Sequence, residues 1–130
     1  MHRGTFEKNY IELRKKEKRV YSDDVVRNLP DYDEHSQKKE WMIRKITMTK
    51  LISYFSEKDN KNLILELGCG NGWLSHQLAI SLKADIVGLD INEVELLQGA
   101  RLFGGCRNLS FHHEILFDPH SPRSLFTRKF

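Results

Sequence analysis

Residues 62–92 read NLILELGCGNGWLSHQLAISLKADIVGLDIN and decide the fold. An apolar run ends in Glu66, and a glycine-rich turn follows at residues 68–72. A helical pattern comes next, and a second apolar run ends in Asp90. This order predicts a strand, a tight turn, a helix and a second, parallel strand. Small ligands bind open α/β sheets at the carboxyl ends of such strands, which is where both acids stand.

The turn carries three glycines at alternate positions, Gly68, Gly70 and Gly72. Glycine lets the backbone take positive φ and approach a ligand with no Cβ in the way. The helix that follows offers unpaired N–H groups and a partial positive charge at its first turn. Asp90 stands 18 residues after Gly72, close to the ~20-residue offset of a carboxylate that binds ribose hydroxyls. These features predict a nucleoside-containing ligand across the ends of two strands.

Two nucleoside-binding motifs can be compared with this stretch. The sequence ELGCGNG at residues 66–72, followed by IVGLDIN at residues 86–92, resembles the glycine motif and the acidic motif of class I S-adenosylmethionine-dependent methyltransferases. The dinucleotide fingerprint G-x-G-x-x-G fits less well, because the third glycine comes one residue early and Trp73 stands where glycine is wanted. An indole there opposes the close helix–strand packing that glycine allows in dinucleotide folds.

The resemblance implies an α/β fold, a Rossmann-like three-layer sandwich built on a parallel sheet. In that family the sheet has seven strands with the first in the middle, whereas only strands 1–3 are expected here, preceded by N-terminal helices. We therefore expect a helical extension or lid at residues 1–60 and a partial cofactor-binding domain at residues 61–130, truncated before strand 4. With strand order 3-2-1 the first strand becomes an edge, and exposed apolar edges pair with other strands. We expect this edge to be covered by another copy or by the N-terminal segment, or to be open because the chain is a fragment.

The resemblance also implies a binding site for S-adenosylmethionine. Glu66 would meet the amino end of the methionine part, the glycine backbones would pass close to the methionine and ribose parts, and Asp90 would hold the ribose hydroxyls. Ile91 would lie against the adenine, and Glu114 would accept from its amino group, with Asp118 as the fallback. From the residues alone, Glu66 and Asp90 could instead accept backbone N–H groups of their own turns. The implied cofactor-binding residues are Glu66, Gly68, Cys69, Gly70, Gly72, Asp90, Ile91 and Glu114.

The N-terminal part is rich in charge. Residues 6–20 predict a polar helix whose basic cluster begins at Arg14. We interpret this cluster as a solvated helix face, because charge runs usually are, with contact to RNA or an acidic partner as the alternative. Residues 36–55 predict a longer helix with a wide apolar stripe. Trp41 and Tyr21 are candidates for a lid over the ligand, although core packing suits Trp41 better.

The remaining part of the chain predicts one more helix and one more strand. Asn92 is a good N-cap, and Glu95 stands at the third helical position, close to a capping box. Gly99 inside this helix costs about 1 kcal/mol relative to alanine, which suggests a close contact with an unidentified neighbour. Residues 109–113 predict the third strand.

Composition narrows the function classes. A chain of 130 residues with 39% hydrophobic and 30% charged residues has the make-up of one globular domain. Apolar stretches fall short of the ~18 residues of a membrane-spanning helix, and the first residues do not resemble a signal peptide. Two cysteines are too few for a disulfide framework, which suits a cytoplasmic setting. A net charge of +3 is too small to indicate nucleic acid by itself.

No metal site is expected. His112 and His113 are adjacent in the third predicted strand, so their side chains point to opposite faces and do not chelate one ion together. No cysteine or carboxylate stands at ligand spacing from them.

Three hypotheses for the function follow. The first is a methyltransferase that uses S-adenosylmethionine and an unidentified methyl acceptor, present here as its cofactor-binding portion without an assigned catalytic base. The second is an NAD(P)-dependent oxidoreductase, against which the early third glycine and Trp73 speak. The third is a non-catalytic nucleotide-binding or interaction module that pairs through the open strand edge.

Overall fold

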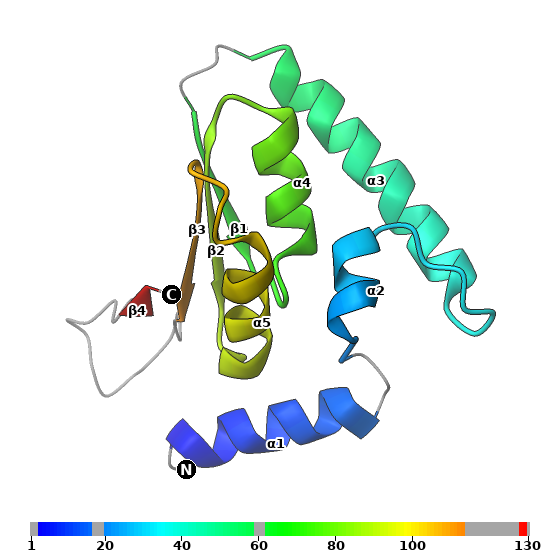
Figure 1. Cartoon of the computed structure of the whole chain (residues 1–130), viewed down its shortest axis with the longest axis vertical. Coiled ribbons are helices and arrows are strands. Elements are labelled where there is room, and N and C mark those ends of the chain that lie inside the picture. Colours follow the sequence, from blue (N-terminus) through cyan, green and yellow to red (C-terminus); the bar gives the residue numbers. More distant parts are fainter. Residues whose placement is uncertain (1–2, 17–19, 59–61, 114–127, 130) are drawn as a thin grey trace.

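The computed structural model is an α/β fold with helices packed beside a sheet (Figure 1). It describes residues 3–16, 20–58, 62–113 and 128–129. In chain order the elements are α1 (Arg3–Lys16), α2 (Asp23–Asn28), α3 (Lys38–Ser56), β1 (Leu63–Leu67), α4 (Trp73–Ser81), β2 (Asp85–Asp90), α5 (Glu93–Phe103), β3 (Leu109–His113) and β4 (Arg128–Lys129).

The sheet has the order β1-β2-β3-β4, with β1, β2 and β3 parallel. This confirms the three parallel strands and the place of β1 at the edge of the described sheet. The register sets Glu66 beside Gly88 and Gly88 beside Phe111, so these three residues lie in one row across the strands. The short strand β4 pairs antiparallel with the end of β3, which the sequence did not predict.

The helices that contact the sheet lie on one of its faces (Figure 1). The second helical layer of the expected three-layer sandwich is not formed by the residues that the structure describes, so that part of the prediction is corrected to two layers. The reason lies in the connections. Both crossovers, through α4 and through α5, step in the same direction along the sheet. Because such crossovers are right-handed, both helices fall on the same side.

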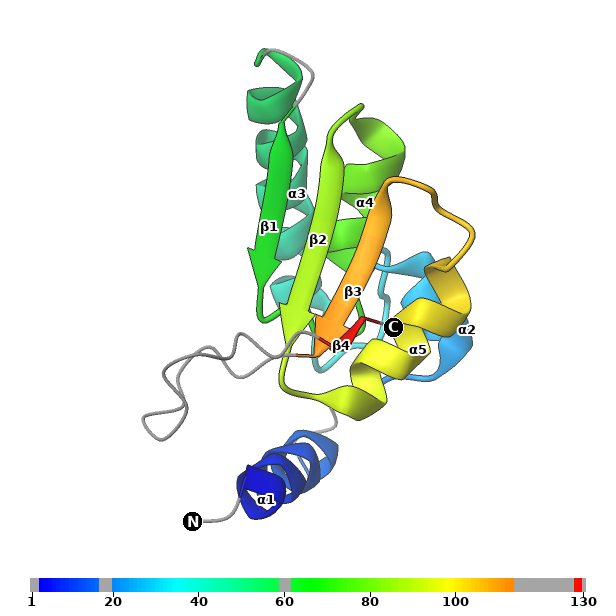
Figure 2. The same ribbon diagram turned by 90° about the vertical axis from the view of Figure 1, so that its left-hand side faces the viewer.

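The opposite face of the sheet is open along β1 (Figure 2). Leu63, Leu65 and Leu67 point to this face and are 68%, 52% and 56% exposed. The alternate residues Ile64 and Glu66 point to the helical face and are half-buried. A strand that is apolar on both faces is typical of the interior of a parallel sheet. Within the described residues, helices cover only one face of β1, and its other, apolar face is exposed.

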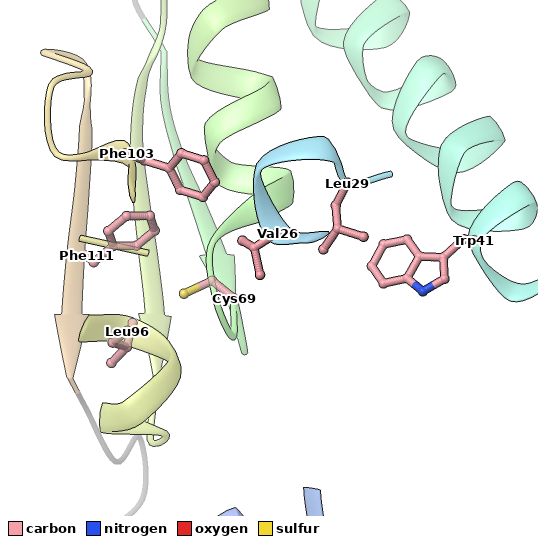
Figure 3. Close-up of a cluster of buried hydrophobic side chains, with 7 residues drawn as sticks. All are labelled: Val26, Leu29, Trp41, Cys69, Leu96, Phe103 and Phe111. Carbon is pink, nitrogen blue, oxygen red and sulfur yellow. The ribbon is translucent and has the colours of Figure 1, made fainter. Parts of the chain in front are cut away.

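The largest core cluster joins the N-terminal helices to the sheet (Figure 3). Trp41 from α3 is 1% exposed and packs in this cluster, so its core role is confirmed. Tyr21 packs against the same cluster, and its hydroxyl accepts from Trp41 Nε1 at 3.2 Å. The buried members of the cluster are Val26, Leu29, Trp41, Cys69, Leu96, Phe103 and Phe111.

The local helix signals are largely confirmed. Asn92 caps α5, with its side-chain oxygen accepting from the Glu95 N–H at 3.2 Å. α3 covers nearly the range that its apolar pattern predicts, and α1 begins at Arg3, three residues earlier than expected. Residues 17–19 of the predicted helix lie outside the described residues. Within the described ranges, no helix has both the length and the apolar character needed to cross a membrane.

Gly99 in α5 has the close contact that its place in a helix suggested. A Cβ at this position would stand 2.4 Å from the carbonyl oxygen of Asn71, in the glycine turn. The missing side chain lets α5 lie directly against the turn. Gly105 just beyond α5 offers a contrast, because a Cβ there would meet nothing within 4 Å.

We predict that Gly99→Ala destabilises the protein, because the methyl group would displace backbone rather than a flexible side chain. Overpacking of this kind costs about 1–3 kcal/mol, and the helix propensity of alanine offsets about 1 kcal/mol of it. Urea unfolding should therefore show a lower midpoint for Gly99→Ala and a change within about 0.5 kcal/mol for the control Gly105→Ala. Equal midpoints for the two variants would contradict the close approach of α5.

Candidate functional site

The turn between β1 and α4 is built on three left-handed glycines. Gly68, Gly70 and Gly72 have φ of 71°, 57° and 80°, a region that side chains rarely adopt. Next to Gly68 the space is open, because a Cβ there would meet no described heavy atom within 4 Å. The Cys69 N–H donates to the Leu89 carbonyl at 2.9 Å, which fastens the turn to β2. The backbone at Gly68 can therefore be approached closely by a ligand.

Gly72 serves the packing of the protein itself. It is the N-cap of α4, and a Cβ on it would stand 2.3 Å from the ring of Phe111 in β3. The start of α4 can lie against this ring only because position 72 has no side chain. The absence of a side chain at Gly72 is therefore explained by the packing of Phe111 and does not by itself indicate a ligand.

Asp90 at the end of β2 joins the glycine turn to the next loop. Its Oδ2 accepts from the Gly70 N–H at 2.6 Å, and its Oδ1 accepts from the Asn92 N–H at 2.8 Å. The side chain is 7% exposed. The turn-holding role that the sequence left open for Asp90 is thus present, and it leaves each oxygen with further acceptor capacity.

Glu66 lies on the same face of the sheet as Asp90. It pairs with Gly88, which is two residues before Asp90 on β2, and side chains two apart on a strand share a face. Glu66 Oε1 accepts from the Ser75 hydroxyl at 3.0 Å. Burial raises the pKa of Glu66 to about 7, the Ser75 hydrogen bonds oppose this rise, and the charge of Asp90 adds to it.

The remaining predicted residues divide into three cases. The Cys69 side chain is 5% exposed in the core, where burial raises the pKa of its thiol far above the ordinary range, so only its backbone faces the turn. Ile91 is half-buried, and its carbonyl lies 3.0 Å from His113 Nε2. Glu114 and Asp118 lie outside the described residues.

Glu95 belongs to this site although the sequence suggested only a cap. Its side chain is 1% exposed, and Oε2 accepts from Asn92 Nδ2 at 2.8 Å. The same oxygen would stand 3.5 Å from a Cβ on Gly70, so the carboxylate lies beside the turn. Oε1 accepts from Arg14 Nη2 at 2.8 Å. The Asn-x-x-Glu spacing was the signal for Glu95, whereas Arg14 was hidden in a basic run.

Helix α1 lies across the carboxyl ends of the strands (Figures 1 and 2). Besides the Arg14–Glu95 pair, His113 Nε2 at the end of β3 lies 3.2 Å from Glu7 Oε1. Both contacts are largely buried, with side-chain exposures of 25% or less. The helix therefore encloses the edge at which the predicted ligand would lie.

The assembled site combines the accessible backbone at Gly68 with the carboxyl groups of nearby acidic side chains. The buried thiol of Cys69 is not a ready nucleophile, because burial raises its pKa. Across the described ranges, no group of three or more histidine, cysteine or acidic side chains is placed to hold a metal ion. No protein-family model matches the chain, and no curated protein matches it.

Glu66 makes a pH-dependent prediction. Up to about pH 7 the folded protein keeps a proton on this carboxyl that the unfolded chain releases near pH 4.5, so the free energy of unfolding falls as pH rises through this range. Glu66→Gln lacks this titration. We compare the free energy of unfolding of Glu66→Gln with that of the unaltered protein. The difference between them should shift by about 3 kcal/mol in favour of the variant from pH 4 to pH 8. Urea unfolding at both pH values measures the difference.

Ser75→Ala provides the control for this prediction. The Ser75 hydroxyl bonds to Glu66 and lowers the pKa of its carboxyl. Its removal should steepen the fall of stability with pH, while Glu66→Gln should flatten it. Parallel stability profiles for all three proteins would contradict the buried state of Glu66.

Proposed function

We propose that this chain is the cofactor-binding portion of an S-adenosylmethionine-dependent methyltransferase with an unidentified methyl acceptor. The observation that carries the proposal is the left-handed glycine turn, flanked on one sheet face by Glu66 and Asp90. Such a turn at the carboxyl ends of parallel strands suits a nucleoside ligand. The resemblance of residues 66–72 and 86–92 to methyltransferase motifs points to the same class of cofactor.

The acceptor capacity of Asp90 supports a ribose contact. A carboxylate has about four acceptor positions, and Gly70 and Asn92 occupy one on each oxygen. The remaining positions suit the two ribose hydroxyls. The same two backbone bonds hold the carboxylate in place before the ligand arrives, which lowers the ordering cost of binding.

The charge around the turn favours a cationic ligand. The acidic side chains of Glu66, Asp90 and Glu95 lie near it. Burial keeps a proton on Glu66 up to about pH 7, and Arg14 offsets the charge of Glu95, so Asp90 is the uncompensated carboxylate among the three. A sulfonium and an α-amino group both carry positive charge, whereas a dinucleotide brings two negative phosphates. A cation next to Glu66 would also favour release of the proton that burial retains there.

The residues divide the work of binding. Glu66 would meet the amino end, and the open backbone at Gly68 would pass close to the methionine and ribose parts. Asp90 would hold the ribose, and Ile91 would border the adenine. The cofactor supplies an activated methyl group on sulfur when it is bound. The protein residues bind and orient, which is the main contribution that an in-line displacement needs from its enzyme.

An oxidoreductase that uses NAD(P) is the less supported alternative. Trp73 at the start of α4 packs edge-on against Trp41, with ring centroids 5.2 Å apart. This indole stands where the dinucleotide fingerprint wants the glycine that allows close packing of the helix on the strand.

A non-catalytic interaction module is a second candidate, and the open face of β1 favours it. Leu63, Leu65 and Leu67 are each more than half exposed there. A strand edge with such a face is suited to pairing, including self-association of two copies. In this candidate the glycine turn would have a structural role and would bind no nucleoside.

We predict that S-adenosylhomocysteine raises the melting temperature of the chain and that NAD does not. Ligand at 100 times its dissociation constant adds about 2.7 kcal/mol to stability, which corresponds to about 10 °C for a domain of this size. A thermal melt with each ligand makes the comparison. A shift with NAD alone would favour the oxidoreductase, and no shift with either would favour the interaction module.

Two asparagine variants on β2 test the carboxylate in that experiment. Asp90→Asn should lose most of the shift, measured from its own ligand-free melting temperature, because a ribose acceptor becomes a donor. Asp85→Asn at the exposed start of the same strand makes the same change in charge and should keep the shift. Loss of the shift in both variants, or in neither, would contradict the ribose contact of Asp90.

A further inference from the structure

Arg14 reaches the candidate site from a distant part of the chain. It belongs to the last turn of α1, and its Nη2 donates to Glu95 Oε1 at 2.8 Å. The pair joins residues 81 positions apart. The Arg14 side chain is 25% exposed, and its partner is almost fully buried. Its contact with α5 is therefore made inside the protein, and the solvated helix face predicted for the basic run does not hold for Arg14.

The partner of Arg14 connects it to the glycine turn. Glu95 Oε2 lies beside Gly70, and the Gly70 N–H donates to Asp90. Burial alone would lower the pKa of Arg14. The hydrogen bond and charge of Glu95, with smaller contributions from Tyr10 and Asp90, outweigh it and leave the pKa raised. The guanidinium is therefore cationic and lies within the electrostatic reach of the predicted ribose carboxylate.

One buried donor of this guanidinium has no acceptor. Arg14 Nε is buried and has no hydrogen-bond partner among the residues that the structure describes. A buried donor without an acceptor costs about 1–3 kcal/mol, more for a charged group. Glu95 uses Nη2, which shares an edge of the planar fork with Nε, and the Nε–H is the buried donor on that edge that still needs an oxygen acceptor.

We propose that Arg14 is a ligand-contacting residue whose Nε–H donates to the carboxylate of an amino-acid-bearing nucleoside bound at the glycine turn. The inference rests on the proposed function and deepens it by assigning the recognition of the amino-acid part to a residue outside the sheet. The carboxylate is the only anionic group of such a ligand at neutral pH. It would give the buried Nε–H an acceptor, next to the Nη2–H that Glu95 already holds.

The experiment compares two probes, S-adenosylhomocysteine and 5′-methylthioadenosine, by calorimetric titration. Both contain the adenosine and a thioether, and only the first carries the amino-acid part. Arg14→Gln should weaken S-adenosylhomocysteine by about tenfold or more, as expected for loss of a charged hydrogen bond. It should leave 5′-methylthioadenosine within about twofold, because that probe offers no carboxylate.

Two further variants keep the result interpretable. Lys15→Gln removes the same charge from the exposed neighbouring position of α1 and should leave the affinity for both probes unchanged. Arg14→Lys keeps the charge beside Glu95 and lacks the Nε donor, so it should also weaken S-adenosylhomocysteine selectively. It serves as the test if Arg14→Gln fails to fold.

Each outcome decides the matter. Equal weakening of both probes would show that Arg14 only supports the fold, and unchanged binding of S-adenosylhomocysteine would show that it makes no ligand contact. Either result overturns the assignment of Arg14 while the proposed function stands. Failure of the unaltered protein to bind either probe would overturn the proposed function and the assignment together.

Discussion

The bond from the Gly70 N–H to Asp90 fixes the geometry on which the site depends. It is 2.6 Å long and joins the turn after β1 to the end of β2, in addition to the backbone bond from Cys69 to Leu89. From the other side, Gly99 lets α5 lie against the same turn. The turn is thus held by β2 on one side and by α5 on the other. A left-handed backbone of this kind persists only where its surroundings determine it.

The sequence predicts those parts of the fold that local pattern controls. The strands, the glycine turn, the helix α3 and the cap at Asn92 each depend on spacing within a few residues, and all are present. The side of the sheet that Glu66 and Asp90 share follows from strand periodicity and parallel register. The candidate site was predictable to this extent because strand ends, turn and acids are consecutive in one stretch of sequence.

What the sequence did not predict depends on contacts between distant residues. The sequence predicts a solvated basic run at the end of α1, because nothing near Arg14 in the sequence points to its partner Glu95, 81 positions later. Gly99 indicates a close contact of its helix, but the sequence does not show that the contact is with Asn71 in the glycine turn. The two-layer arrangement follows from the direction in which the strands are added. The expected second layer came from the family fold and has no counterpart in the described residues.

The attachment of α1 differs in kind from that of the other N-terminal helices. The apolar core contains Val26 of α2, its C-cap Leu29 and Trp41 of α3, whereas Phe6 and Leu13 of α1 are about half exposed. Polar pairs attach α1 instead, from Arg14 to Glu95 in α5 and from Glu7 to His113 at the end of β3. Buried ion pairs add little net stability, because desolvation offsets their attraction. Elements with few buried apolar contacts open at lower free energy than the core does. We therefore expect α1 to separate from the strand ends at a lower free energy than α2 and α3 separate from the core.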